Sequence, residues 1–105
     1  MTHQNDEPQK DQMHRRLDHQ VAYELGDEWV SEERFQWVLE RSDHKLVLGW
    51  SWMLKNWYAV IRTPDGAGHR FYADATHRDH PKAALESLRT GMEDGLAYLR
   101  KHKWF

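Results

Sequence analysis

Three runs of aromatic and β-branched residues, separated by short segments, constrain the fold of this chain more than any other feature. The runs cover residues 46–54, 57–63 and 69–75. Residues of these types are enriched in β-strands. Lys55-Asn56 fits a two-residue hairpin loop, and a Pro-Asp-Gly turn sequence separates the second and third runs. The pattern therefore predicts three antiparallel strands, each paired with the next along the chain.

Residues 31–41 fit either a strand or a helix. Phe35, Trp37 and Leu39 alternate as on one face of a strand, whereas Ser31 followed by two glutamates resembles a helix N-cap with acids in the first turn. Because aromatic and β-branched residues dominate the segment, we favour a fourth strand over about 34–40. The alternative is a sheet of three strands, with residues 31–41 helical.

Residues 81–102 have the spacing of an amphipathic helix that begins near Pro81. Its apolar residues recur every three or four positions: Leu85, Leu88, Met92, Leu96 and Leu99. Gly91 and Gly95 lie near this stripe, and glycine inside a helix is unfavourable unless a close approach requires it. The two glycines therefore predict that the helix packs tightly over tryptophan side chains. A helix break at Gly91 is the alternative.

A second helix is predicted within residues 10–25. Four apolar residues recur there at every fourth position: Met13, Leu17, Val21 and Leu25. Gly26 follows directly, as a glycine does at many helix ends. Residues 1–12 are almost entirely polar, so we expect a disordered tail before a single domain over 13–105.

These elements predict an α+β fold. A four-stranded antiparallel β-meander packs one face on the C-terminal helix, and the N-terminal helix flanks or covers the other face. The two-residue loop pairs Leu54 with Trp57, and the second loop pairs Thr63 with His69. In this register Arg62 lies directly opposite Arg70.

The sheet face opposite the C-terminal helix is the predicted binding surface. It carries Tyr58, Arg62, Arg70 and Tyr72, and tyrosine and arginine are enriched in protein interfaces. Trp104 is a further candidate contact. As an alternative, the acidic N-terminal segment covers this face. The acids that would then neutralise the arginines are Glu24, Asp27 or Glu28.

The charge and the cysteine count exclude several function classes. The net charge of −2 lacks the strongly basic footprint of an electrostatically driven nucleic-acid binder. It conceals an asymmetry: residues 1–40 hold 10 acids against 4 Lys and Arg, a net of −6, and residues 41–105 carry +4. The absence of cysteine excludes a disulfide scaffold, a thiolate zinc site and a cysteine nucleophile.

Catalytic motifs give little support to an enzyme. No serine lies in a nucleophile elbow, and no glycine-rich phosphate loop joins a strand to a helix. His77 and His80 are three residues apart and near carboxylates, so a metal-dependent enzyme is one alternative. We predict no cofactor and no metal site. A nucleic-acid-binding module that uses the Arg/Tyr face and the basic C-terminus is the other alternative.

Residues 57–99 resemble the HicB-type antitoxins of bacterial toxin–antitoxin systems. The shared pattern is a hairpin followed by a polar turn into an Ala/Leu helix, here Asp79-His80-Pro81-Lys82-Ala83-Ala84-Leu85. The chain departs from these proteins in lacking their Pro-Gly-rich loop and a separate DNA-binding segment. The resemblance implies a small protein that neutralises a partner.

The sequence therefore predicts a small non-catalytic protein that acts by occupying a macromolecular partner. Inhibitor, immunity, antitoxin-like and phage anti-defence proteins are of this type. We expect a cytoplasmic location, because the chain shows neither a signal peptide nor a membrane-spanning run. The expected partner is a protein. A homodimer formed through the open sheet face or an exposed edge strand is the competing arrangement.

Overall fold

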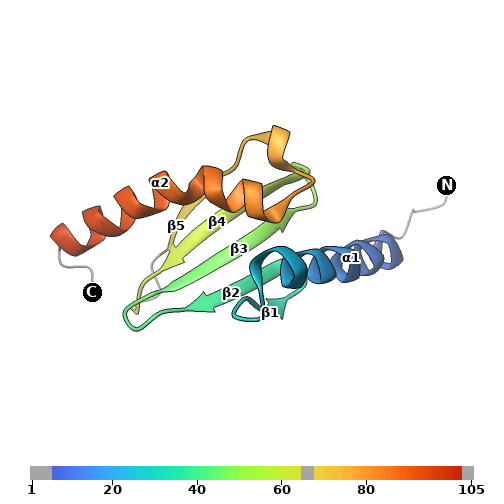
Figure 1. Cartoon of the computed structure of the whole chain (residues 1–105), viewed down its shortest axis with the longest axis horizontal. Coiled ribbons are helices and arrows are strands. Elements are labelled where there is room, and N and C mark those ends of the chain that lie inside the picture. Colours follow the sequence, from blue (N-terminus) through green and yellow to red (C-terminus); the bar gives the residue numbers. More distant parts are fainter. Residues whose placement is uncertain (1–5, 65–67, 103–105) are drawn as a thin grey trace.

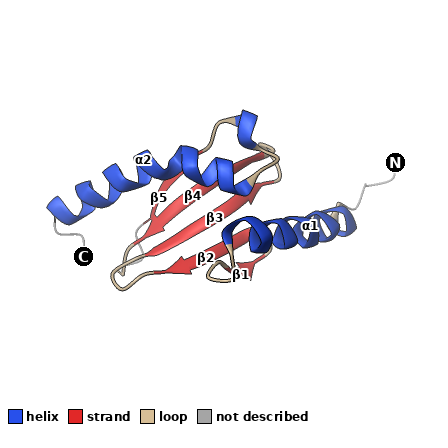
Figure 2. Cartoon of the chain, viewed as in Figure 1, coloured by secondary structure: helices blue, strands red, loops and turns tan. Residues whose placement is uncertain are grey.

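A computed structural model of the chain describes residues 6–64 and 68–102. The elements follow one another as α1 (Glu7–Leu25), β1 (Val30–Glu33), β2 (Gln36–Glu40), β3 (Lys45–Ser51), β4 (Asn56–Arg62), β5 (Gly68–Tyr72), the 3-10 turn η1 (Ala75–His77) and α2 (Pro81–Lys101). Figure 2 shows one sheet with both long helices against it. The predicted α+β class is confirmed.

The sheet has five strands, in the order β1-β2-β3-β4-β5, and every neighbouring pair is antiparallel. The predicted meander is therefore confirmed, but the count of four was wrong because β1 was missed. The strand expected over 34–40 begins at Gln36, since Arg34 and Phe35 form the turn between β1 and β2. Phe35 has a φ of 66°, and its N–H donates to His14 Nδ1 at 3.1 Å, which anchors this turn to α1.

Both helices lie on the same face of the sheet (Figure 1). The prediction that the N-terminal helix flanks or covers the opposite face was therefore wrong. α1 contributes Leu17 and Val21 to the same apolar cluster as Leu88 and Leu99 of α2. The largest fully buried side chains of this cluster are Trp37, Trp57, Leu48 and Ile61. We call this side of the sheet the helix face and the other side the open face.

The helix boundaries differ from the predictions at one end. α1 begins at Glu7, inside the segment 1–12 that we expected to be a disordered tail, and residues 1–5 lie outside the described residues. Gly26, with a φ of 96°, ends α1 as expected, and its N–H donates to the carbonyl of Ala22. α2 begins at Pro81 and continues through Gly91 without a break.

Both predicted strand registers were wrong, by four residues and by two. β3 ends at Ser51, and residues 52–55 form the turn, so Trp50 rather than Leu54 pairs with Trp57. In the second hairpin Arg62 pairs with Gly68, and Arg70 pairs with Val60. The predicted opposition of Arg62 and Arg70 therefore does not occur. Since both shifts are even, every residue that lies in a strand stays on its predicted face.

The two glycines of α2 lie over an aromatic ring, but that ring is Phe71 and not a tryptophan. A Cβ atom added to Gly95 would lie 2.9 Å from the Phe71 ring, and one added to Gly91 would lie 3.4 Å from it. The predicted close approach is therefore confirmed at Gly95, while the identity of the covered side chain was wrong. The tryptophans instead form a cluster in which Trp57 contacts Trp37 and Trp50.

Candidate functional site

The observed register arranges the open face in three rows that run across the strands. A tyrosine row contains Gln36, Gly49, Tyr58 and Tyr72, which pair in that order from β2 to β5. A valine row contains Val38, Val47 and Val60 and ends at Arg70. A charged row contains Glu40, Lys45 and Arg62 and ends at Gly68. Neighbours within a row are close enough to interact directly.

The tyrosine row is held together by one ring that lies flat on the sheet. A Cβ atom at Gly49 would lie 2.1 Å from Cζ of Tyr58, so the Tyr58 ring occupies the space above the glycine. The Tyr58 hydroxyl accepts a hydrogen bond from the Gln36 side chain at 3.1 Å, two strands away. Tyr58 is consequently only 8% exposed, although no helix covers it. Gly49 is therefore required for this arrangement.

Arg70 is held above this ring by aromatic contacts. Its guanidinium carbon lies 4.7 Å from the centre of the Tyr58 ring, within the range of a cation–π interaction. Nη1 lies 3.4 Å from the Tyr72 hydroxyl, and this hydrogen bond raises the pKa of the arginine above its ordinary value. Arg70 and Tyr72 are both exposed, Tyr72 to 51%. Among the described residues no carboxylate lies within ion-pair distance of Arg70.

The other cations of the open face have partners. Lys45 lies 3.3 Å from Glu40, and Arg62 lies 3.8 Å from Glu32 of β1. The second pair spans β2 and β3, the strands that carry Val38 and Val47, and Val47 is fully buried although no helix covers it. The alternative, in which the acidic N-terminal segment covers this face, was thus wrong. α1 lies on the helix face, and the acid that pairs with Arg62 is Glu32.

The structure gathers three of the predicted contact residues into one cluster and separates the others. Tyr58, Arg70 and Tyr72 contact one another, with Tyr58 buried beneath the other two. Arg62 lies on the same face but at the far end of β4, in its ion pair. Trp104 lies outside the described residues.

Two exposed apolar residues in the turn before β4 were missed as candidates. Met53 and Leu54 occupy the turn between β3 and β4, with exposed fractions of 88% and 57%. Their apolar character led us to place them in a strand. The signal that marks the turn is Ser51, whose hydroxyl accepts a hydrogen bond from the Leu54 N–H at 3.1 Å.

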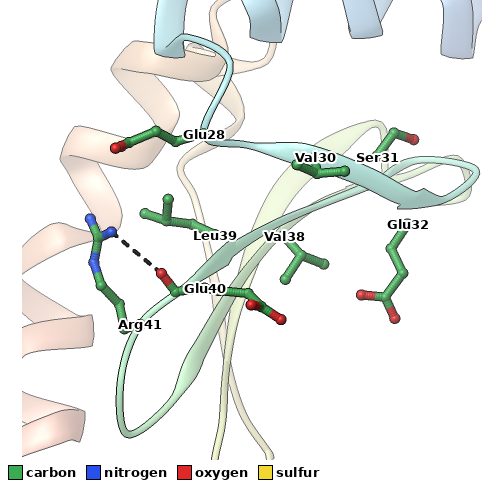
Figure 3. A pocket seen from close by; sticks show the side chains of 8 residues that line it. All are labelled: Glu28, Val30, Ser31, Glu32, Val38, Leu39, Glu40 and Arg41. Carbon is green, nitrogen blue, oxygen red and sulfur yellow. Dashed lines mark hydrogen bonds between the residues drawn. The ribbon is translucent and has the colours of Figure 1, made fainter.

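A groove of about 550 Å³ lies beside the outer edge of β2, where β1 no longer pairs with it (Figure 3). Three of the side chains that line it end in carboxylates: Glu28, Glu32 and Glu40. Arg41 is the one cation among the lining residues, and its Nη1 lies 3.5 Å from the carbonyl of Glu40. This lining does not favour an anionic ligand.

The groove also holds one serine near a histidine. Ser31 Oγ lies 3.5 Å from His14 Nε2, a spacing at which a histidine can activate a hydroxyl. However, Nδ1 of His14 accepts the Phe35 N–H, so the neutral ring carries its proton on Nε2. In that tautomer Nε2 cannot take a proton from Ser31. The pair is therefore arranged as a structural contact between α1 and β1.

Three carboxyl groups of the described residues have lowered pKa values. Hydrogen bonds from Arg34, His44 and the Thr76 N–H lower the pKa values of Glu7, Asp43 and Asp74, respectively. A general acid at neutral pH needs a raised pKa. Within residues 6–64 and 68–102, no three His, Asp or Glu side chains are placed to hold a metal ion, His77 and His80 included.

Comparisons with protein-family models, with curated protein sequences and with solved structures find no match to this chain. The likeness of residues 57–99 to HicB-type antitoxins therefore stays a resemblance. None of the described helices combines the length and the apolar character that crossing a membrane requires.

Proposed function

We propose that this chain is a non-catalytic binding protein of the cytoplasm that occupies a protein partner through the open face of its sheet. One observation carries the proposal. Arg70 is exposed and charged, is oriented by Tyr58 and Tyr72, and has no carboxylate partner among the described residues. An arginine held in place in advance loses less conformational freedom when it binds a carboxylate.

The surroundings of Arg70 favour a protein partner over a nucleic acid. A phosphate backbone is bound by several unpaired cations along one surface. On the open face Lys45 and Arg62 are already paired with Glu40 and Glu32. The face thus combines Arg70, a cation with no carboxylate partner among the described residues, with half-exposed Tyr72 and buried valines, a composition typical of protein interfaces.

The test is affinity capture from the source cell with matched baits, followed by mass spectrometry. The baits are the native chain, Arg70→Glu, and Arg89→Glu as a control. Arg89 is an exposed arginine of α2, on the helix side of the molecule, that pairs with Glu93. We expect a specific protein to be retained by the native chain and by Arg89→Glu, and to be lost with Arg70→Glu.

Equal capture by all three baits would overturn the proposal. Far-UV circular dichroism and thermal unfolding show whether Arg70→Glu keeps the native fold. Recovery of nucleic acid that is released steeply by salt would instead support the nucleic-acid alternative, because phosphate contacts make affinity strongly salt-dependent.

A further inference from the structure

The outer edge of β5 has unused main-chain hydrogen-bonding groups. β5 is the last strand of the sheet, and among the described residues no strand pairs with its outer side. The Ala73 N–H donates to the Trp57 carbonyl at 3.0 Å, so the main-chain N–H of Ala73 points inward, toward β4. Along an antiparallel strand, residues whose main-chain groups bond to the neighbouring strand alternate with residues whose main-chain groups point away from it. The main-chain groups of Arg70 and Tyr72 therefore point outward.

The residues with outward main-chain groups are also those with side chains on the open face. Side chains alternate between the two faces of a strand, and Arg70 and Tyr72 share the face of Val60 and Tyr58. A strand added to β5 would therefore receive main-chain hydrogen bonds from Arg70 and Tyr72. Its own side chains on that face would lie directly beside the guanidinium and the phenol ring.

The opposite edge of the sheet is protected against such pairing, whereas β5 is not. β1 has four residues, a bulge between Ser31 and Glu33, and two adjacent glutamates. Short length, bulges and charges are the usual means of preventing strand addition. β5 pairs with β4 in an unbroken register of five residues and contains no proline.

We propose that the partner adds an extended acidic segment to the outer edge of β5, with a carboxylate on Arg70. This inference rests on the proposed function, since it specifies how the open face is occupied. Main-chain hydrogen bonds supply affinity in strand addition, and side chains at alternate positions supply specificity. The unpaired charge of Arg70 selects Asp or Glu at the position directly opposite, and charge-assisted hydrogen bonds to a carboxylate are the strong ones.

A second copy of the chain is a poorer occupant of this edge. Two β5 strands paired with Arg70 opposite Arg70 would bring like charges together, which is destabilising. β5 contains no acidic residue that could relieve this repulsion, and the residue before Arg70 is His69.

The experiment uses the ¹⁵N-labelled full chain and two defined peptides. In one seven-residue peptide Glu alternates with Val, and in the control Lys replaces every Glu. We expect the Glu peptide to slow amide hydrogen exchange at Arg70 and Tyr72 by about tenfold or more, because the ladder leaves both amides without a strand partner among the described residues. The Lys peptide should have no such effect. Arg70→Gln should weaken binding of the Glu peptide by about tenfold.

The outcomes separate this inference from the proposed function. If the Tyr58 and Tyr72 ring signals shift while the Arg70 and Tyr72 amides stay unprotected, strand addition is overturned and binding to the face is retained. If the two peptides protect β5 equally, or neither does, selection of an acidic segment is overturned. Protection of the same amides without peptide, together with a doubled mass in light scattering, would show that a second copy occupies the edge and would also overturn the inference.

Discussion

The two faces of the sheet exclude water by different means. On the helix face α1 and α2 cover large side chains, so that Trp37, Trp57, Leu48 and Ile61 are fully buried. On the open face the covering layer consists of side chains from the sheet itself. Tyr58 lies flat over Gly49, and Arg70 lies over Tyr58.

This difference shows where binding capacity can remain in a small protein. The polar groups that cover the open face are mostly paired within it, Arg62 with Glu32 and Lys45 with Glu40. Arg70 is exposed and oriented without such an acidic partner among the described residues. A face covered by its own side chains needs only a small rearrangement to admit a partner, whereas the helix face would have to lose a helix.

The largest expected effect tests the helix face. Trp57→Ala should lower the free energy of unfolding by about 3–5 kcal/mol, because it leaves a cavity between Trp37 and Trp50. It also leaves the Arg78 carbonyl without the indole N–H that now donates to it at 2.8 Å. Urea unfolding measures the change. Tyr72→Ala on the open face is the control and should cost far less, since Tyr72 is half exposed; similar losses would contradict the comparison.

A smaller effect tests whether the open face depends on Gly49. Gly49→Ala places a methyl group where the Tyr58 ring lies, and we expect a loss of about 1–3 kcal/mol from overpacking. In a Tyr58→Ala background the same substitution should cost little, because the ring is gone. Unfolding of the four variants forms a double-mutant cycle. Equal costs in both backgrounds would show that the ring does not depend on the glycine.

The two helix glycines should respond in opposite directions. Gly91→Ala places its methyl at ordinary contact distance from Phe71, so the gain of up to about 1 kcal/mol in helix propensity should be realised. Gly95→Ala places its methyl 2.9 Å from Phe71 and 3.4 Å from Ile61, and overpacking should outweigh that gain by about 1 kcal/mol. Thermal unfolding of both variants measures the difference. A more stable Gly95→Ala would show that the helix can move away from the sheet.

The smallest expected effect concerns the contact between the β2–β3 hairpin and the end of α2. Asp43 hydrogen-bonds with His44 and with Arg100 at 3.1 Å, and both interactions lower its pKa below the ordinary 3.8. A lowered pKa stabilises the fold above pH 3.8, and this contribution is lost as the pH falls through the lowered pKa. Asp43→Asn should therefore reduce stability slightly at pH 7 and not at pH 2. An equal reduction at both pH values would mean that the charge of Asp43 does not contribute.

Much of the candidate site could be predicted from the alternation of residues along the strands. Tyr58, Arg62, Arg70 and Tyr72 lie on one face, as expected, because a register error of two or four residues leaves the faces unchanged. The partners within each row could not be predicted, since they depend on the loop between strands. The apolar Trp52, Met53 and Leu54 suggested a longer strand, but their segment forms the turn.

The sequence by itself determined the fold class, the two faces of the sheet and the end of α1 at Gly26, because side-chain periodicity and glycine conformation are local properties. Only the tertiary structure decided that both helices share one face, that β1 exists, and that Arg70 lies over Tyr58 with no carboxylate partner among the described residues. These features depend on register and on contacts between distant segments. Such contacts are set by the packing of the whole chain and leave no local pattern.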